Sequence, residues 1–412
     1  MIPYNRHDYS VRKDNYMNVK KRLFSILLCG AILMTSACNT TDDPAATDPA
    51  ETTPAVVSNA PASVVDGEIR DISSVELISE LTAGWNLGNT LDATGGSGLS
   101  SETSWGNPKT TKEMMDTVKS AGFDIVRIPV TWGGHLDSEN NIDPDWLNRV
   151  QEIVDYTIDE DTYVIINLHH EDWNYPFYDN QEAAITKMKA VWGQIAERFK
   201  NYDEHLIFEG QNEPRHVGTS DEWGGGTDEG WEVVNATNAA FVETVRNSGG
   251  NNAMRHLMIP GYCATSDSRG PDRIALPEGD NKIIVSVHAY LPYSFALSDT
   301  PSSKFSSQRE NATKDIKNLR DTLKTGYIDK GIAVIIGETG ARNKDNLESR
   351  IDWAHTYTSI MREIGVTCIW WDNGSFSGKG ENFGLLHRQT NTWMFPEVVE
   401  AFISGAGGTY SA

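Results

Sequence analysis

Short apolar runs alternate with longer segments of helical periodicity along most of the chain. Each run is rich in β-branched or aromatic residues and ends in polar ones, a pattern typical of buried parallel strands. The eight runs span residues 84–90, 125–132, 163–170, 206–214, 257–263, 283–290, 333–340 and 368–374. The intervening periodicity predicts helices at 109–121, 145–158, 182–200, 231–248, 307–325 and 347–364.

Eight strands that alternate with helices favour an α/β fold, a (β/α)8 (TIM) barrel that closes on itself. The alternative is an open, doubly wound nucleotide-binding sheet. Residues 84–89 (GWNLGN) contain glycines but lack the spacing of a dinucleotide-binding loop. The sequence therefore predicts a single barrel domain, which we place at residues 68–412.

The residues before this domain do not share its pattern. Residues 17–22 (MNVKKR) are basic and residues 23–34 are apolar, as in a signal peptide, and the run is shorter than the ~20 residues of a membrane-spanning helix. Small residues precede Cys38, so we expect residues 1–38 to be a leader and signal peptide that ends at a lipidated cysteine. Residues 39–67, rich in Thr, Pro, Ala and Asp, predict a flexible linker.

Lipidation at Cys38 would place an exported protein on the cell surface or the outer membrane. A secreted protein cut near Ala37 is the alternative. The chain carries a formal net charge of −23, which disfavours nucleic acid and anionic membrane surfaces as partners, so membrane contact is expected only through the lipid. We expect a monomer. Cys263 and Cys368, the cysteines of the barrel segment, are expected to be free thiols.

Polar and aromatic side chains gather at the ends of the predicted strands. Active sites of (β/α)8 barrels lie at the carboxyl ends of their strands. The residues there come from six different runs and are Arg127, His169, Asn212, Glu213, His288, Tyr290, Glu338 and Trp371. Their convergence favours a functional site over packing.

Two of these residues suit cleavage of a glycosidic bond with retention of configuration. That reaction needs two carboxyl groups about 5 Å apart, one as proton donor and one as nucleophile. Glu213 ends the fourth run and Glu338 ends the seventh, and these strand ends face each other across a barrel mouth. For either glutamate alone, a solvated loop residue is the alternative.

Longer strings resemble glycoside hydrolase family 5. Residues 212–214 (NEP) resemble its acid/base motif and residues 337–340 (GETG) its nucleophile motif. Further strings similar to subfamily 4, which is rich in endoglucanases and xyloglucanases, are GWNLGNTLDA, WGNP, RIPVTW, INLHHE, FEGQNEPR, SVHAYLPY and WWDNG. The resemblance covers about residues 76–402. It implies a retaining endo-β-1,4-glucanase acting on cellulose-like glucan, mixed-linkage glucan or xyloglucan, with Glu213 as acid/base and Glu338 as nucleophile.

The polar neighbours of these glutamates have expected roles. Arg127 points inward by strand parity and would hold Glu338 ionised by charge and hydrogen bonds. Tyr290 would donate a hydrogen bond to Glu338. Asn212 is placed to bind the sugar 2-hydroxyl, a contact that strengthens in the transition state.

Three histidines lie near the expected site. His288 would orient Glu213, and His169 resembles the third-strand histidine of the family. His170 has the opposite parity and is expected to contact substrate. The string at residues 169–171 (HHE) lies on a predicted strand without the HExxH spacing, so we expect no metal and no cofactor.

Aromatic rings stack on the apolar faces of sugars, which suggests roles for several tryptophans. Trp371 would form the floor beneath the sugar under attack, and Trp105 and Trp173 are the favoured outer platforms. Asn86 and Asn89 would bind sugar hydroxyls, with a turn-forming role as the equal alternative.

Other residues near the strand ends have structural interpretations. Trp370 is expected to face the helices, and Glu209 to form a buried ion pair. The segment 223–226 (WGGG) is a candidate loop of the positive subsites. Alternative functions are a β-mannanase on the same scaffold and a surface glycan-binding lipoprotein without catalysis.

Overall fold

The computed structural model describes residues 58–299 and 304–411. The expectations for the leader, the signal peptide and Cys38 fall outside these ranges. The described residues all belong to one compact unit. Within them, no helix combines the length and the apolar character needed to cross a membrane.

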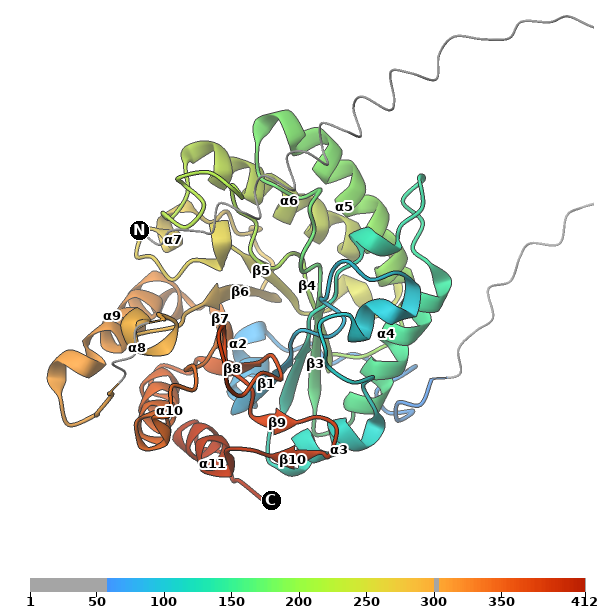
Figure 1. The fold of residues 1–412 in the computed structure, drawn as a ribbon. Coiled ribbons are helices and arrows are strands. Elements are labelled where there is room, and N and C mark those ends of the chain that lie inside the picture. The colour runs from blue at the N-terminus through green and yellow to red at the C-terminus, as the bar shows by residue number, and fades with distance from the viewer. Residues whose placement is uncertain (1–57, 300–303, 412) are drawn as a thin grey trace, which may run out of the picture. The chain divides into compact units, whose positions relative to one another are not determined.

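Eight parallel strands close into a barrel in chain order, with β8 paired to β1 (Figure 1). The prediction of a (β/α)8 barrel is confirmed. The strands are β1 (Ala83–Leu87), β2 (Ile125–Ile128), β3 (Tyr163–Asn167), β4 (Leu206–Glu209), β5 (Leu257–Pro260), β6 (Ile283–His288), β7 (Ala333–Thr339) and β8 (Thr367–Asp372). Each strand ends before its predicted run does, because the last polar residues leave the ladder and form loops.

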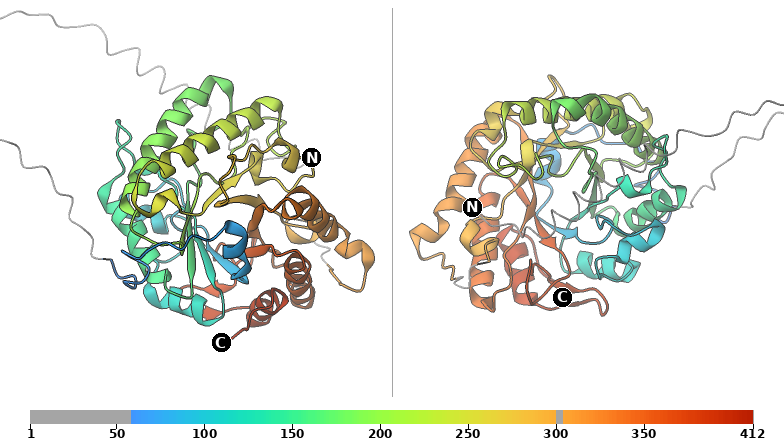
Figure 2. Two further views of the ribbon diagram at one scale, coloured as in Figure 1. Left: turned by 180° about the vertical axis from the view of Figure 1, so that it is seen from behind. Right: turned by 45° about the horizontal axis from the view of Figure 1, so that its top comes forward.

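Helices surround the strands on the outside of the barrel (Figure 2). The six that were predicted are α3 (Lys112–Ser120), α4 (Pro144–Thr157), α5 (Tyr178–Arg198), α6 (Asp228–Arg246), α9 (Glu310–Gly326) and α10 (Leu347–Arg362). Local sequence starts them: the Thr111 side chain, for example, accepts a hydrogen bond from the N–H of Met114 in α3. Elements that were not predicted are α2 (Ser74–Ser79), α7 (Gly270–Arg273), α8 (Tyr293–Ala296), α11 (Pro396–Gly405), the strands β9 (Leu386–His387) and β10 (Thr392–Trp393), and the 3-10 helices η1 (Gly98–Thr103), η2 (Gly133–His135), η3 (Gly250–Ala253), η4 (Tyr262–Ala264) and η5 (Ile328–Lys330).

Strand alternation divides the apolar residues into an inner and an outer cluster. In β2, Ile125 belongs to the cluster inside the barrel, whereas Val126 and Ile128 belong to the cluster beneath the helices. Arg127 is therefore turned inward, as its parity predicts. The same alternation directs Trp370 of β8 outward, where it packs edge-on against Trp353 of α10.

The short helix α2 closes the amino-terminal end of the barrel. Its Leu77 joins the inner apolar cluster and is fully buried. Ser74 anchors the helix through a 2.8 Å hydrogen bond between its Oγ and Nδ1 of His256, which precedes β5. Functional side chains are thereby left to the opposite, carboxyl-terminal end.

The folded domain begins earlier than the predicted boundary at residue 68. Val64 is fully buried, its carbonyl accepts a 2.9 Å hydrogen bond from the N–H of Asp203, and Val65 forms a β-bridge with Tyr202. Because Val64 and Val65 are apolar, the last residues of the expected linker pack against the segment around Tyr202. Cys263 and Cys368 are both free thiols, as expected.

Candidate active site

Arg127 of β2 is the buried charge around which the site is built. Its Nε donates to Glu209 Oε2 at 2.7 Å, and its Nη2 donates to Asn212 Oδ1 at 2.6 Å. Its Nη1 donates to Glu338 Oε1 at 2.8 Å and to Asn86 Oδ1 at 3.0 Å. Burial alone would lower the pKa of Arg127, but the charges of Glu209 and Glu338 raise it above its ordinary value. The guanidinium therefore stays charged and fixes all four acceptors.

Glu209, the last residue of β4, completes this buried network. Besides Arg127, its carboxylate accepts hydrogen bonds from Ser286 Oγ at 2.7 Å and from Asn167 Nδ2 at 2.9 Å. It is fully buried. The predicted buried ion pair is confirmed, and all of its partners belong to the barrel wall.

A bulge near the end of β7 aims Glu338 into the barrel mouth. The pairing between β6 and β7 shifts after Val287, so that His288 lies opposite Glu338 and Gly337 has no partner in β6. Asn86 of β1 donates from Nδ2 to the carbonyl of Gly337 at 2.9 Å, which fixes the bulge.

Glu338 is bonded to Arg127 and Tyr290, and Nδ1 of His288 lies 3.6 Å from its Oε2. Arg127 bonds to its Oε1, and the hydroxyl of Tyr290 donates to its Oε2 at 3.0 Å. Burial raises the pKa of Glu338 above its ordinary value, because it outweighs the charges of His288 and Arg127; Arg127 thus acts in the predicted direction without lowering this pKa overall. Burial and the charge of Glu338 also raise the pKa of Tyr290 well above its ordinary value, so the phenol remains a hydrogen-bond donor.

Glu213 lies in the loop beyond β4 and not within the strand, which corrects the prediction that it ends the fourth strand. Strand alternation is lost directly after Glu209, because Gln211 turns outward and bonds to Asn238 of α6 at 2.7 Å. The chain then turns back toward the barrel axis and presents Glu213 at the mouth.

Two basic residues contact Glu213. Nδ1 of His288 lies 2.7 Å from its Oε1, and Nη1 of Arg215 lies 3.5 Å from its Oε2. Burial alone would raise the pKa of Glu213, but the hydrogen bond and charge of His288, helped by Arg215, outweigh it and lower this pKa to about 2. Although burial opposes it, the charges of Glu338 and Glu213 raise the pKa of His288. Because the pKa of Glu213 is lowered and that of His288 is raised, the proton shared by these two residues resides on His288, whose Nδ1 donates it in the hydrogen bond to Glu213.

The two carboxyl groups approach each other across the mouth. One oxygen of Glu213, one of Glu338 and one nitrogen of His288 all lie within 4.8 Å of one another. A separation of about 5 Å between carboxyl groups suits a retaining double displacement, in which one attacks a sugar carbon directly. The geometry is thus compatible with glycosidic cleavage through a covalent intermediate.

His169 and His170 form a second group beside the carboxylates. The pKa of His169 lies well below its ordinary value because the ring is buried, and its Nδ1 lies 3.2 Å from Asn167 Nδ2. The ring is parallel to that of Trp371, with centroids 5.7 Å apart. His170 stands edge-on to His169, and its Nε2 lies 3.9 Å from Asp92 Oδ2, so these three residues also present donor atoms of metal-ligand type.

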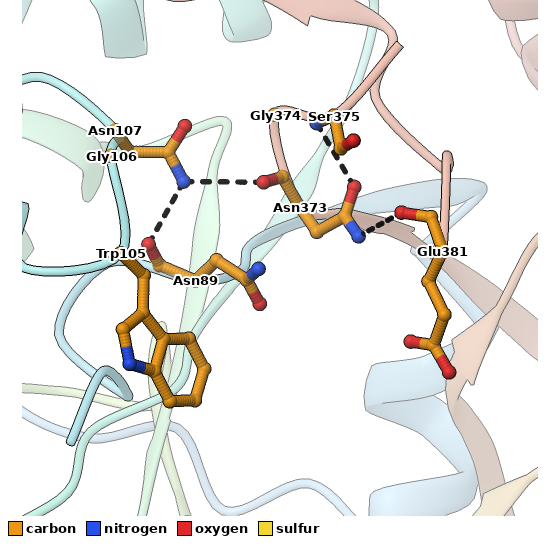
Figure 3. A pocket seen from close by; sticks show the side chains of 8 residues that line it. All are labelled: Asn89, Trp105, Gly106, Asn107, Asn373, Gly374, Ser375 and Glu381. Carbon is orange, nitrogen blue, oxygen red and sulfur yellow. Dashed lines mark hydrogen bonds between the residues drawn. The ribbon is translucent and has the colours of Figure 1, made fainter. Parts of the chain in front are cut away.

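A cavity of about 420 Å³ opens between the loops after β1 and β8 (Figure 3). Nδ2 of Asn107 ties its two walls together by donating to the carbonyls of Asn89 at 2.8 Å and Asn373 at 3.2 Å. The remaining lining residues are Trp105, Gly106, Gly374, Ser375 and Glu381. Trp105 is exposed, and in Figure 3 its indole and the Glu381 carboxylate lie beside open space.

The structure separates the predicted sugar contacts into two groups. Trp105 and Asn89 line the cavity, and the backbone of Asn89 also forms a turn in the left-handed region (φ 55°). Asn86 does not reach it: the side chain is fully buried, and its amide and carbonyl are bonded to Arg127 and the backbone. The prediction that Asn86 binds sugar is wrong because its register beside Arg127 places it below the mouth.

Trp173 is also not brought to the cavity. Its indole N–H donates to Glu171 Oε2 at 2.5 Å, and Nζ of Lys187 lies 5.5 Å from the ring centroid. Glu171 in turn accepts the backbone N–H groups of Trp132 and Gly133. These contacts give Trp173 a structural position in the loop after β3.

Sequence reasoning missed four polar residues of the site. Asn167 and Ser286 hold Glu209, Arg215 contacts Glu213, and Glu381 enters the cavity. Strand parity was a usable signal for Asn167, which shares a face with His169. Arg215 directly follows the NEP motif, whereas no local signal marks Glu381, which reaches the site through the fold of its loop.

Comparisons with known proteins place these features in context. Residues 90–377 match the family model described as cellulase, glycosyl hydrolase family 5. Endoglucanase A of Ruminococcus albus is 48% identical over 345 residues, which cover 82% of this chain and 94% of the relative. A broad-specificity endoglucanase of subfamily 4 from Ruminococcus champanellensis, solved with bound cellotriose, is 46% identical with a TM-score of 0.79, and the match covers 82% of this chain and 99% of that one. A xyloglucan-specific endo-β-1,4-glucanase from a metagenomic library, solved in complex with cellotriose, is 43% identical with a TM-score of 0.77. The match covers 80% of this chain and 98% of that one.

Proposed function

This chain belongs to the cellulase family, glycosyl hydrolase family 5, and is an endo-β-glucanase; from that premise we propose how its residues divide the work. Glu338 is the nucleophile and Glu213 the acid/base of a retaining double displacement. The observation that carries this assignment is the pair of carboxylates within 4.8 Å, of which Glu338 bonds to Arg127 and Glu213 has the shorter contact with His288.

The first step forms a glycosyl ester on Glu338. Its carboxylate oxygen attacks the anomeric carbon, and the bond from that carbon to the bridging oxygen breaks. Glu213 receives the proton of His288 through their hydrogen bond and donates a proton to the departing oxygen, so the leaving sugar departs as an alcohol. Arg127 and Tyr290 orient Glu338 for this attack.

The second step releases the sugar with its original configuration. The Glu213 carboxylate takes a proton from water, and the water oxygen attacks the anomeric carbon. The ester bond to Glu338 breaks and restores its carboxylate. Asn212, held by Arg127, is placed to bind the 2-hydroxyl of the reacting sugar in both transition states.

Substrate binding is assigned to the mouth and the adjoining cavity. Trp371, stacked parallel to His169, forms the floor beneath the reacting sugar. Trp105 is the outer platform, and its ring centroid lies 5.6 Å from that of His170, which bridges the two regions. Asn89 and Glu381 offer polar groups to sugar hydroxyls.

The substrates proposed for this site are β-1,4-linked glucan chains, including mixed-linkage glucan and xyloglucan. The bound cellotriose in two similar structures and the xyloglucan specificity of one of them support this range. Purified enzyme is expected to release reducing ends from carboxymethyl cellulose, barley glucan and xyloglucan. If the enzyme releases reducing ends from glucomannan alone, its substrate would instead be β-mannan.

We also propose that Cys38 carries a lipid that tethers a monomeric enzyme to the cell surface. The basic and apolar residues before Cys38 support this proposal. Membrane fractionation of cells that produce the enzyme tests it: the wild type is expected in the membrane fraction and Cys38→Ala in the soluble fraction. Equal partitioning of both would refute the anchor.

A further inference from the structure

Arg388 carries a buried charge that the proposed reaction steps do not use. The residue directly follows β9, in the turn that leads to β10, and its side chain is buried. Asn391 takes a left-handed φ of 52° as this turn closes. The hairpin of β9 and β10 is a separate sheet outside the barrel (Figure 1), yet its turn sends a cation to the barrel strands.

The guanidinium of Arg388 bonds to the ends of two strands at once. Its Nη1 donates to the carbonyl oxygen of Gly88 at 2.9 Å and to Oγ1 of Thr90 at 2.7 Å, both in the loop after β1. Its Nη2 donates to the carbonyl oxygen of Asp372, the last residue of β8. The N–H of Gly88 donates to the same carbonyl oxygen at 3.0 Å. Arg388 therefore ties the carboxyl ends of β1 and β8 together.

The side chain of Asp372 holds the hairpin against the barrel. Its Oδ2 accepts the backbone N–H groups of Leu385 at 3.0 Å and Leu386 at 2.9 Å, and the indole N–H of Trp85 in β1 at 3.0 Å. Its Oδ1 lies 3.4 Å from Nη2 of Arg388. Burial lowers the pKa of Arg388, and the charge of Asp372 opposes this effect. The buried cation thus has a fixed counter-ion beside the two strand ends.

The loops that Arg388 joins lie at the proposed sugar-binding surface. Gly88 packs so closely on Trp371 that a Cβ would approach Cζ2 of the indole to 2.9 Å. Asn89 and Asn373, the next residues of the two loops, line the cavity of Figure 3. A shift between the two strand ends would therefore change the position of the indole relative to the cavity.

We propose that Arg388 is a positioning residue that sets the Trp371 floor against the loop after β1. It would thereby determine the affinity for the half of the glucan that becomes attached to Glu338. This inference rests on the proposed function, in which Trp371 lies beneath the reacting sugar. Neither Glu213 nor Glu338 has Arg388 among its hydrogen-bond partners, so sugar binding should depend on Arg388 more than the chemical step does.

Arg388→Lys tests the role because it keeps the charge and removes the forked donor. The substrate is β-cellobiosyl fluoride, whose leaving group is a single atom, so that it occupies only the half of the cleft attached to Glu338. The variant is expected to raise KM for the fluoride about tenfold and to change kcat by no more than about threefold. Fluoride release, followed with an ion-selective electrode, measures both constants.

Arg255→Lys is the matched control for a buried guanidinium. Arg255 is fully buried and donates to four backbone carbonyl oxygens, including that of Leu206, the first residue of β4. These contacts lie at the amino-terminal end of the barrel, away from the mouth. Arg255→Lys is therefore expected to lower the melting temperature, as Arg388→Lys does, and to leave KM at the wild-type value.

Thr90 provides a second, milder test that holds even if Arg388→Lys fails to fold. Thr90→Val removes the hydroxyl that accepts from Arg388 and leaves the charge in place. It is expected to raise KM for the fluoride about threefold. Thr90→Ser, which keeps the hydroxyl, should retain the wild-type KM.

The outcomes separate this inference from the function beneath it. If Thr90→Val leaves KM unchanged, or if Arg255→Lys raises KM as much as Arg388→Lys does, the positioning role is refuted while the hydrolase stands. Trp371→Ala tests the premise. If that variant binds the fluoride as tightly as the wild type, the proposed floor fails and this inference with it.

Discussion

Glu213 and Glu338 are chemically identical side chains that the fold distinguishes by their partners. Arg127 and Tyr290 bond to Glu338, whereas His288 bonds to Glu213 at 2.7 Å and lies 3.6 Å from Glu338. The charge of Arg127 opposes the rise that burial causes in the pKa of Glu338, and the titratable imidazole of His288 can exchange a proton with Glu213. This difference supports the proposed division into nucleophile and acid/base.

Replacement of Glu213 should remove proton transfer and leave the nucleophile in place. Glu213→Ala is expected to lower kcat on cello-oligosaccharides by about 10²- to 10⁴-fold. Azide, which attacks without a general base, should restore turnover of β-cellobiosyl fluoride and give the β-azide, identified by proton NMR. Lack of rescue, or an α-azide, would count against this role.

Replacement of His288 should change the pH profile. Because the wild-type pKa of His288 is raised, the proton of the pair is retained above pH 6.5 and lost as the pH rises through that raised value. In His288→Asn the proton must reside on a carboxyl group alone, so the alkaline limb of kcat/KM is expected to move to lower pH. An unchanged limb would exclude His288 as a partner in proton storage.

At the level of strands and loops, sequence patterns predict the site well up to the point where each strand ends. Strand parity correctly predicted that Arg127 points inward and Trp370 outward, because both residues lie within regular strands. Parity did not apply beyond β4, where Gln211 turns to α6 before Glu213 returns. The bulge at Gly337, and the use of Asn86 to hold it, depend on register between strands, which one strand's sequence does not contain.

The α2 helix belongs to this scale because it contributes to folding and not to catalysis. Leu77→Ala removes a fully buried side chain from the inner cluster and is expected to lower the free energy of unfolding by about 3 kcal/mol. Val75→Ala, at a residue that is 47% exposed on the same helix, is the matched control and should have little effect. Denaturant unfolding measures both, and kcat per folded molecule should stay at the wild-type value. A loss of kcat in Leu77→Ala would contradict the separation of the two barrel ends.

At the scale of the whole molecule, stability should fall in acid because buried histidines must become charged on unfolding at low pH. Burial, with the nearby charges of Lys282 and Arg246, lowers the pKa of His256 to about 3. A folded pKa below the unfolded value of 6.5 means that this contribution is complete above pH 6.5 and is lost as the pH falls toward 3. His256→Asn keeps a partner for Ser74 without the titration, so its stability should fall less than that of the wild type between pH 6.5 and 4, by about 3 kcal/mol. Parallel curves of melting temperature against pH would contradict the assignment.

The barrel could be predicted because short local patterns in the sequence mark each of the eight strands and most of the helices between them. The start of the domain could not, because the burial of Val64 depends on a partner at Tyr202 and Asp203, far along the chain. Glu381 shows the same limit within the cavity, since only the folded loop after β8 brings it beside Trp105. Contacts distant in sequence therefore account for most of the differences.

The central claim is that Glu338 becomes covalently bonded to the sugar. An activated 2-deoxy-2-fluoro-β-cellobioside forms the ester but slows its hydrolysis, so the intermediate accumulates and the modified peptide is identified by mass spectrometry. The label is expected on Glu338, and Glu338→Gln, which keeps the shape of the side chain, should remain unlabelled. A label on another residue, or an active enzyme that releases the α-anomer first, would contradict the account.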